Sequence, residues 1–573
     1  MSLFPIIGQD ELPQAAPPEP GPEPVLQTNR DPDIRGHFPF PTIREAQSKS
    51  LDAIVESARA GKKFTLIEAP TGVGKSGLLI AAASWAKTRP CGPGMRSGAY
   101  ILSTQKTLTA QYMRDFAEMG LLELRGRGNY QCATHETDCA SAAVFQGDDP
   151  EENCAKRGVC GYANAKKLFM ASEIGVTNFS YYLTETMYAG QLPPRNYLCL
   201  DECHNVENQL LGFTDTEFTV QRAAEIEVVL PVLKPGAGGN TEAARKWLED
   251  TAFPKVSEYL GSLEAAVTEA RMDNQRDEAI RLAKKFGAWQ QFAKRLSLFT
   301  KTDRPGDWIA FSDINPKTGK GTGSLVIKPL TATLFADGLL LSKASNVIMT
   351  SATILDFRTF MRNLGINPAE ANVLAVPSEF PVENRPIFYK PCGNMAWKTK
   401  QEALPKVAAF MLRLMEKYAG KKGIIHAQSY ENLRYFTDFL TANGQGRRLI
   451  THTSLPGSRE EAVARHCASP DDTVIISPSM TEGLDLKEDL SRFQIIPKVP
   501  YMALDPYTKA RMERDPQWYQ YMAALSLIQA TGRSVRSKTD KAHTWILDSG
   551  FGPFLSRNES IMPEWWTDSI QFL

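Results

Sequence analysis

Residues 69–76, Ala-Pro-Thr-Gly-Val-Gly-Lys-Ser, have the pattern of a phosphate-binding loop. The apolar run at 64–67 before them predicts a strand, and the Ala-rich stretch at 77–86 after them predicts a helix. Gly72 and Gly74 allow backbone N–H groups to turn toward phosphates, and the helix N-terminus adds the positive end of its dipole. A chance glycine-rich turn is the alternative, but the strand and helix on either side favour a nucleotide site.

Lys75 is expected to reach the β and γ phosphates, and Ser76 to bind Mg²⁺ through its hydroxyl. The apolar run Tyr197–Leu200 predicts the third strand of the chain, and a second part of the same site is expected directly after it. That strand ends in Asp201, a candidate Mg²⁺ ligand, and Glu202, a candidate for polarising the attacking water. A solvated acidic turn is the alternative for an isolated pair of this kind.

Four cysteines, Cys132, Cys139, Cys154 and Cys160, lie in a segment poor in apolar residues. Such a segment is hard to fold unless something crosslinks it, and four thiolates around one metal centre would do so. The spacing does not separate zinc from an iron–sulfur cluster, and His135 could replace one ligand. Four independent small apolar residues remain the alternative.

Two pairs of polar residues have helical spacing and could complete a nucleotide site. Arg44 and Gln47 share a helix face before the phosphate loop, and the Gln47 amide can donate to and accept from an adenine edge. Arg533 and Arg536 can point at one anionic target and would reach the γ-phosphate if a second α/β unit faced the first. Arginine pairs on a surface are usually solvated, so this second role depends on the fold.

Length and charge set limits on the rest. The chain has 573 residues, too many for one core, and 65 basic residues balance 65 acidic ones, so any nucleic-acid site must be a local groove. No apolar run is long enough to cross a bilayer, the start lacks the features of a secretion signal, and nine cysteines indicate reduced thiols or metal ligands. We therefore predict a cytoplasmic protein.

Strands alternating with helices predict an α/β fold with parallel sheets and ligands at the strand ends. The proline-rich start cannot pack a core. The expected divisions are a disordered leader (1–36), a first α/β unit in three parts (37–121, 169–204 and 346–385), a cysteine segment (122–168), a helical insertion (205–345) and a second α/β unit (386–573).

In these motifs and their order the chain resembles the superfamily 2 iron–sulfur DNA helicases of the XPD and DinG type. The resemblance covers roughly residues 38 to 550 and rests on 68–76, 126–132, 176–182, 200–205, 350–353, 380–385, 482–485 and 529–536. Two departures are visible: Cys203 stands where Ala is usual, and Gly423–Tyr430 is unusual apart from its strand and its Ser-Tyr.

The resemblance implies two RecA-like motor domains, with a [4Fe–4S] domain on the four cysteines and a helical arch inserted in the first. It also implies ATP and Mg²⁺ as cofactors, 5′ to 3′ translocation on single-stranded DNA, and unwinding of duplex DNA or a DNA–RNA hybrid. The residues it assigns to ATP are Arg44, Gln47, Thr71, Gly72, Gly74, Lys75, Ser76, Gly483 and Asp485. Catalysis is assigned to Lys75, Asp201, Glu202, Gln529, Arg533 and Arg536.

DNA contact or coupling is expected from Thr104, Arg125, Arg127, Tyr130, Ser351 and Thr353, with Lys156, Arg157, Lys166 and Lys167 as further basic candidates beside the cysteines. Expected substrates are single-stranded DNA and a duplex fork or R-loop. We expect a monomer, with the proline-rich leader as a possible site for a protein partner and with no room in it for a nuclease domain.

Three alternatives remain open from the sequence. One is a translocase that serves a larger phage, plasmid or CRISPR-type complex and unwinds little alone. Another is a phosphate-loop enzyme such as a small-molecule kinase, which predicts no second α/β unit. The last is a redox-responsive nucleic-acid-binding protein with a vestigial motor.

Overall fold

The computed structural model describes residues 33–145, 154, 158–190, 192–234, 240–314, 321–455, 457–478, 486, 488–532, 534–535 and 537–573. Several predicted residues lie outside this part of the chain, namely the leader up to residue 32, Lys156, Arg157, Gly483, Asp485, Arg533 and Arg536. Within the described residues, no helix combines the length and apolar character needed to cross a membrane.

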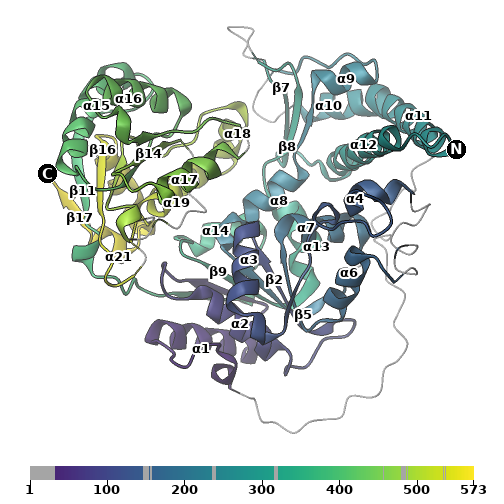
Figure 1. Ribbon diagram of the computed structural model, residues 1–573, viewed down its shortest axis with the longest axis horizontal. Coiled ribbons are helices and arrows are strands. Elements are labelled where there is room, and N and C mark those ends of the chain that lie inside the picture. The colour runs from purple at the N-terminus through teal and green to yellow at the C-terminus, as the bar shows by residue number, and fades with distance from the viewer. Residues whose placement is uncertain are drawn as a thin grey trace.

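The first α/β unit is built on a parallel sheet at the lower centre of Figure 1. Its strand order is β10 (Ala371–Ala375), β1 (Phe64–Glu68), β9 (Ala344–Ser351), β5 (Arg195–Asp201), β2 (Arg96–Ser103), β4 (Ile174–Asn178) and β3 (Leu121–Glu123). The helices of this unit are α1 (Glu45–Arg59), α2 (Lys75–Ala86), α3 (Lys106–Asp115), α6 (Gly161–Ala171), α7 (Phe179–Thr184), α8 (Val206–Thr214), α13 (Thr333–Leu339) and α14 (Phe357–Leu364).

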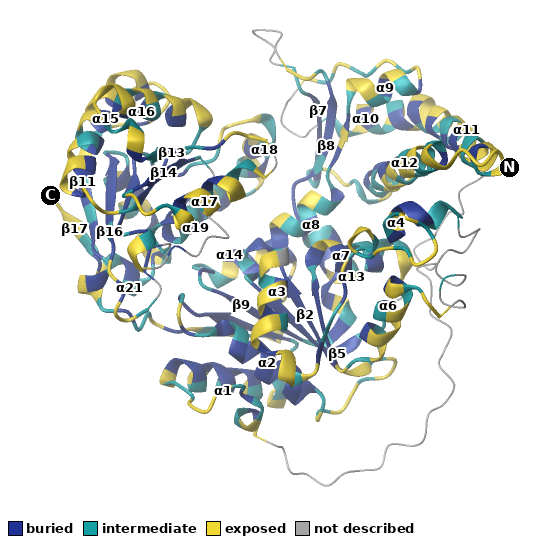
Figure 2. Ribbon diagram, viewed as in Figure 1, coloured by how far each residue is buried: buried dark blue, intermediate teal, exposed yellow. Residues whose placement is uncertain are grey.

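Helices cover both faces of this sheet, so its strands are apolar on both sides (Figure 2). In β5, Leu198 and Leu200 pack into one core cluster while Tyr197 and Cys199 pack into the other. This alternation explains why the sequence shows near-continuous apolar runs at the strands.

The second α/β unit has its own parallel sheet, at the left of Figure 1. Its strand order is β13 (Leu449–Ile450), β14 (Val474–Ser477), β12 (Gly423–His426), β15 (Phe493–Ile496), β16 (His543–Asp548), β11 (Ile387–Gly393) and β17 (Ile570–Phe572). Its helices are α15 (Lys400–Lys417), α16 (Tyr430–Ala442), α17 (Ser458–Ala468), α18 (Pro506–Arg514), α19 (Pro516–Thr531), α20 (Phe551–Asn558) and α21 (Glu564–Thr567). The prediction of two α/β units with parallel sheets is confirmed.

Between α8 and α13 the chain forms a small antiparallel sheet and a group of helices, at the upper right of Figure 1. The strands are β6 (Thr216–Phe218), β7 (Trp308–Ser312) and β8 (Leu325–Pro329), and the helices are α9 (Val220–Glu225), α10 (Thr241–Trp247), α11 (Phe253–Met272) and α12 (Arg276–Thr302). β7 and β8 pair as an antiparallel hairpin. Trp289 and Phe292 of α12 are buried in the core of this region.

One expectation about the first sheet is wrong. The strand ending in Asp201 is not the third along the chain, because β3 and β4 come before it. β3 has three residues, and β4 carries a glycine that the ring of Phe169 covers, so neither gives the strong apolar pattern of a central strand. β4 places Asn178 at the same sheet edge as the ends of β1 and β5.

Candidate functional site

The phosphate loop joins β1 to α2 in the predicted way. Gly72 and Gly74 have φ angles of 87° and 85°, in the left-handed region that favours glycine, so the loop can turn its backbone toward a ligand. Lys75 begins α2 and is largely buried, with its Nζ 3.4 Å from the carbonyl oxygen of Ala69 and 3.7 Å from Oε1 of Glu202. The lysine thus joins the two predicted halves of the site.

Arg44 and Gln47 bind the loop from the start of α1. Nη2 of Arg44 donates to the carbonyl oxygens of Gly72 and Val73 at 2.8 and 2.7 Å, and Nε2 of Gln47 donates to Val73 at 2.8 Å. The Gln47 Oε1 accepts from the backbone N–H of Arg44 at 2.9 Å. The amide nitrogen therefore holds the loop while the amide oxygen caps the start of α1, which sequence spacing alone does not indicate.

Asp201 is buried at the end of β5. The hydroxyl of Tyr112 on α3 donates to its Oδ2 at 2.8 Å, and Ser76 interacts with the same tyrosine. Burial, together with the charge of Glu202, raises the pKa of Asp201 to about 6, while Lys75 and Tyr112 act in the opposite direction. A cation bound here would favour the ionised form of this carboxyl, which is the behaviour expected of a Mg²⁺ ligand.

Glu202 connects the acid pair to the end of β9. It has a left-handed φ of 50°, and its Oε2 accepts from the Ser351 hydroxyl at 3.4 Å. Nδ1 of His204 lies 2.7 Å from the same hydroxyl and 3.4 Å from Oε2 of Glu202. The backbone N–H of Thr353 donates to Ser351 Oγ at 3.1 Å. The acid, the histidine and the β9 end therefore form one polar network.

A cleft of about 550 Å³ lies between the two α/β units at this network. Residues of the first unit on its walls include Thr71, Gly72, Thr104, Glu202, His204 and Thr353, and residues of the second include Ile387, Gln529, Gly532, Val535 and Trp565. The structure thus brings Gln529 to the same cavity as the phosphate loop and the acid pair.

The end of β1 is tied to the second unit. The buried carboxylate of Glu68 accepts from the backbone N–H groups of Ile354 and Leu355, after β9. The carbonyl oxygen of Ile354 in turn accepts from the hydroxyl of Tyr521 on α19 at 3.0 Å. α19, which also carries Gln529, is therefore linked through Ile354 to the strand that precedes the phosphate loop.

A second tie crosses the cleft at Glu379. Its Oε2 lies 3.5 Å from Nη1 of Arg44 and 3.1 Å from Nζ of Lys538. Glu379 and Tyr112 lie outside the sequence motifs, whereas Glu68 and His204 lie within 68–76 and 200–205 but had no predicted role.

The four predicted cysteine ligands all lie in the described residues. Burial and the neighbouring thiols of Cys160 and Cys154 raise the pKa of Cys139 to about 12. Cys132 lies with its Sγ 3.7 Å from Nδ1 of His135. Across the described part of the chain, no three His, Cys, Asp or Glu side chains lie close enough together to hold a metal ion.

The predicted DNA contacts beside the cysteines differ in exposure. Arg125 is half-exposed and pairs with Glu123 at 2.6 Å, and the Arg127 guanidinium lies 5.2 Å from the ring centre of Tyr162. Lys167 is exposed. Lys166 is buried in an ion pair with Glu185 at 3.1 Å, so its prediction as a surface contact is wrong. Tyr130 is partly buried, and its hydroxyl accepts from the Arg125 N–H at 3.3 Å.

Two family models match the chain, one on each α/β unit. The family described as "Type III restriction enzyme, res subunit" matches residues 40–229, and "Helicase C-terminal domain" matches residues 411–569. The first match contains the phosphate loop and the acid pair, and the second contains Gln529. The two models therefore match the units that form the two walls of the cleft.

The chain is also similar to curated proteins. It is 23% identical over 335 residues to the ATP-dependent DNA helicase DinG of Photobacterium profundum, covering 53% of this chain and 48% of that protein. It is 22% identical over 635 residues to the 3′-5′ exonuclease DinG of Bacillus subtilis, covering 86% of this chain and 67% of that protein. The chain thus spans about half the length of the first of these relatives.

Solved structures share the fold. A structure titled XPD helicase aligns with a TM-score of 0.62 at 16% identity, covering 93% of this chain and 100% of the other. Xpd4 of S. tokodaii aligns with a TM-score of 0.55 at 14% identity, covering 92% of this chain and 100% of the other. The two family models in this order and the DinG relatives, together with the shared fold, support a superfamily 2 helicase of the XPD and DinG type.

Proposed function

We propose that this chain is an ATP-dependent DNA helicase that moves 5′ to 3′ on single-stranded DNA and separates duplex DNA or a DNA–RNA hybrid. The observation that carries the proposal is the single cleft at which Gly72, Glu202 and Gln529 meet from two α/β units. A phosphate-loop kinase needs no second unit on the opposite wall, so the cleft favours a motor whose two halves close around a nucleotide.

In this proposal the loop and Lys75 bind the triphosphate, while Ser76 and Asp201 hold Mg²⁺. Bound Mg²⁺ would neutralise charge on the phosphates. Glu202 is the residue that orients and polarises the attacking water, because its carboxylate lies 3.7 Å from the lysine and faces the cleft. Gln529, Arg533 and Arg536 are proposed to complete the site from the second unit.

Hydrolysis is proposed to reach the DNA through Ser351 and Thr353. The Ser351 hydroxyl binds Glu202 and is close to His204, so a change at the acid alters the contacts of the loop after β9. Thr104 comes directly after β2 and lies on the same cleft wall as Thr353. A strand held across these loops would be moved as the cleft opens and closes.

The four cysteines are proposed to hold a [4Fe–4S] cluster beside the DNA path. The donor set fits in its chemistry, because thiolates are the ligands that such clusters take, and the thiol of Cys139 is influenced by those of Cys160 and Cys154. A bound cluster would crosslink the segment. Arg125, Arg127 and Tyr130, with Lys156, Arg157 and Lys167, are proposed to contact single-stranded DNA or the fork by phosphate pairing and base stacking.

The experiment is ATP hydrolysis with and without single-stranded DNA, on protein purified without oxygen and with iron and zinc counted in the same preparation. The proposal expects strong stimulation by DNA and about four irons per chain, as for a [4Fe–4S] cluster. A forked substrate with either a 5′ or a 3′ single-stranded arm then tests the direction of movement.

Hydrolysis that ignores DNA would contradict the proposed motor. Zinc in place of iron would contradict the cluster while leaving the motor in place. Stimulated hydrolysis without strand separation on any fork would instead indicate a translocase.

A further inference from the structure

Trp397, in the loop between β11 and α15, is an exposed tryptophan in a chain that buries the others. All nine tryptophans lie in the described residues, and Trp397 alone among them is in the exposed class, with 87% of its surface accessible. An indole ring gains much of its interaction energy by covering its large apolar surface. The ring of Trp397 is therefore available to a ligand.

The loop that carries Trp397 is anchored on both sides of the ring. Met395 is fully buried in the core of the second α/β unit. The backbone N–H of Ala396 donates to Oδ1 of Asn394 at 2.9 Å, and the Thr399 hydroxyl donates to the carbonyl oxygen of Asn394 at 2.8 Å. The exposed ring thus lies on a hydrogen-bonded turn rather than on a loosely held segment.

Asp548 joins this loop to a second one. It is the last residue of β16, which lies between β15 and β11 in the sheet, and it is buried. Its Oδ1 accepts from the backbone N–H of Met395 at 3.1 Å, and its Oδ2 accepts from the backbone N–H of Val499 at 3.0 Å. The loops after β11 and β15 are therefore held together at the carboxyl edge of the sheet, where parallel sheets commonly bind ligands.

Lysines from both loops lie at this edge. Lys398 follows Trp397 and is exposed, and Lys498 is partly buried in the loop after β15. Lys400, the first residue of α15, pairs with Glu431 at the start of α16 at 2.7 Å. Burial and the charge of Lys400 lower the pKa of Lys498. An anion bound here would favour the charged form of Lys498.

We propose that Trp397, Lys398 and Lys498 form a surface of the second α/β unit that binds a single nucleic-acid strand, with a base stacked on the indole and phosphates held by the lysines. An aromatic face and cations are what a single strand needs from a protein, whereas a duplex offers no base face within its length. The inference rests on the proposed function and deepens it, because the DNA contacts expected from the sequence all lie before residue 354, outside this unit.

The test measures binding of a fluorescein-labelled oligo-dT of about 16 nucleotides to the full chain, without ATP. Trp397→Ala is expected to weaken binding by about 5- to 150-fold, the loss of one stacked base. Trp397→Phe keeps a ring and should retain most of the affinity, but should lose part of the quenching of tryptophan emission by DNA. Lys398→Ala should lower the dependence of affinity on salt by about one ion.

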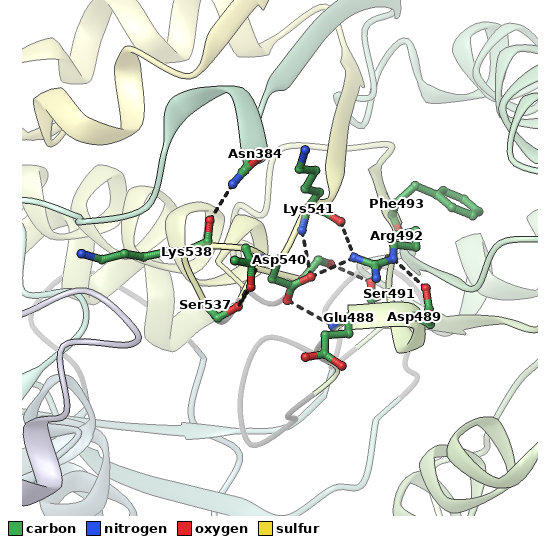
Figure 3. A network of polar contacts seen from close by, with 12 residues as sticks. Asn384, Glu488, Asp489, Ser491, Arg492, Phe493, Ser537, Lys538, Asp540 and Lys541 are labelled. Carbon is green, nitrogen blue, oxygen red and sulfur yellow. Dashed lines mark hydrogen bonds and ion pairs between the residues drawn. The ribbon is translucent and has the colours of Figure 1, made fainter.

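Two control variants lie at the opposite, amino-terminal edge of the same sheet. Lys421 is exposed just before β12, so Lys421→Ala should leave affinity and its salt dependence unchanged. Asp540 is buried just before β16 and accepts from Nη1 of Arg492 at 3.0 Å and from the backbone N–H of Glu488 at 3.1 Å (Figure 3). Asp540→Asn should lower Tm and keep the affinity, whereas Asp548→Asn should lower both.

Unchanged affinity in Trp397→Ala would overturn the proposal, and it is the result expected if the ring serves a protein partner instead. Equal losses of affinity in Asp540→Asn and Asp548→Asn would also overturn it, because the effect would then be general damage. Hydrolysis by the wild type is measured with and without DNA. Binding that depends on Trp397 without stimulation contradicts the helicase proposal alone, whereas stimulation with unchanged affinity in Trp397→Ala contradicts only this inference.

Discussion

Arg511 on α18 forms an ion pair with Glu207 on α8, across the boundary between the two α/β units, with side-chain exposures of only 3% and 9%. Asn363 on α14 donates to the other carboxylate oxygen of Glu207 at 3.0 Å. Glu207 comes shortly after the acid pair along the chain, and α18 leads directly into α19, which carries Gln529. A buried charged contact therefore joins the two α/β units.

Removing one partner of this pair is expected to destabilise the protein strongly. Arg511→Ala leaves the Glu207 carboxylate buried without its cation, which costs about 3 to 5 kcal/mol of unfolding free energy. Urea unfolding measures the change. The control is Arg362→Ala, which breaks a more exposed pair with Asp515 at the same boundary and should cost at most about 1 kcal/mol. Equal losses would mean that burial does not govern the Arg511 contact.

Glu202→Gln is expected to reduce ATP hydrolysis by roughly 100- to 10,000-fold, because an amide cannot accept a proton from the attacking water. Binding of ATP should persist, since Lys75 and the phosphate loop are unchanged. Single-turnover hydrolysis and nucleotide affinity are measured together, with the exposed Glu370→Gln as control. Loss of binding in step with hydrolysis would argue against the assigned role.

The pKa of Asp201 predicts how hydrolysis depends on pH. In the folded protein this pKa is about 6, above its usual 3.8, so hydrolysis should rise as pH increases through about 6 and Asp201 becomes available to Mg²⁺. A higher Mg²⁺ concentration should move this acid limb of the pH profile to lower pH, because Mg²⁺ competes with the proton for Asp201. Tyr112→Phe removes a hydrogen bond that lowers the pKa and should move the limb to higher pH.

The effect of Asp201 on stability has the opposite sign. Between pH 3.8 and about 6 the folded state holds a proton that the unfolded state has lost, so the contribution of this group to unfolding free energy falls as pH rises. Acid loss of hydrolysis near pH 6 is therefore not unfolding caused by Asp201. A melting temperature that does not fall as the pH is lowered through about 6 would agree, and a pH dependence of hydrolysis unmoved by either Mg²⁺ or Tyr112→Phe would contradict the assignment.

Gln47→Ala distinguishes two roles for the amide. Since Gln47 holds the backbone of the phosphate loop, its loss should weaken ATP and GTP similarly, by roughly 3- to 10-fold for one hydrogen bond. An adenine-reading amide would instead lose affinity for ATP alone. Titration with both nucleotides decides between these outcomes, and Ser48→Ala on the same helix is the control.

Metal counts of two variants test the ligand set. Cys132→Ala should lose iron, whereas His135→Ala should retain it, because thiolates are the preferred ligands of such clusters. The exposed Cys91→Ala is the control. Loss of iron in His135→Ala with retention in Cys132→Ala would instead make His135 the ligand. The two candidate ligands lie side by side, with Cys132 Sγ 3.7 Å from His135 Nδ1, so the comparison separates them.

The parts of the site that could be predicted are those whose residues lie close together along the chain. Lys75 and the acid pair follow apolar strands within a few residues, and parallel strands bring such ends to one edge. Tyr112 could not be found in this way, because it reaches Asp201 from 89 positions away and no spacing pattern links an isolated tyrosine to a distant carboxylate.

The same limit explains the errors in the fold and in the basic candidates. Lys166 looks like a surface cation in sequence, but Glu185 on a different helix neutralises it inside the core. β3 and β4 are too short or too polar to stand out. Glu68 could have been read as a buried strand residue, but the backbone N–H groups after β9 that donate to it are brought there by the sheet order, which periodicity does not give.

The position of β1 has a consequence for the synthesis of the protein. Its neighbours in the sheet, β9 and β10, are both made much later, so the strand that carries the phosphate loop has no partner until β9, which ends at Ser351, has been translated. At bacterial and eukaryotic rates of translation that delay is roughly 15 to 60 s. An apolar strand with two open edges can pair with other nascent chains during this time. The nucleotide-binding strand is therefore where we expect chaperones to protect the emerging chain.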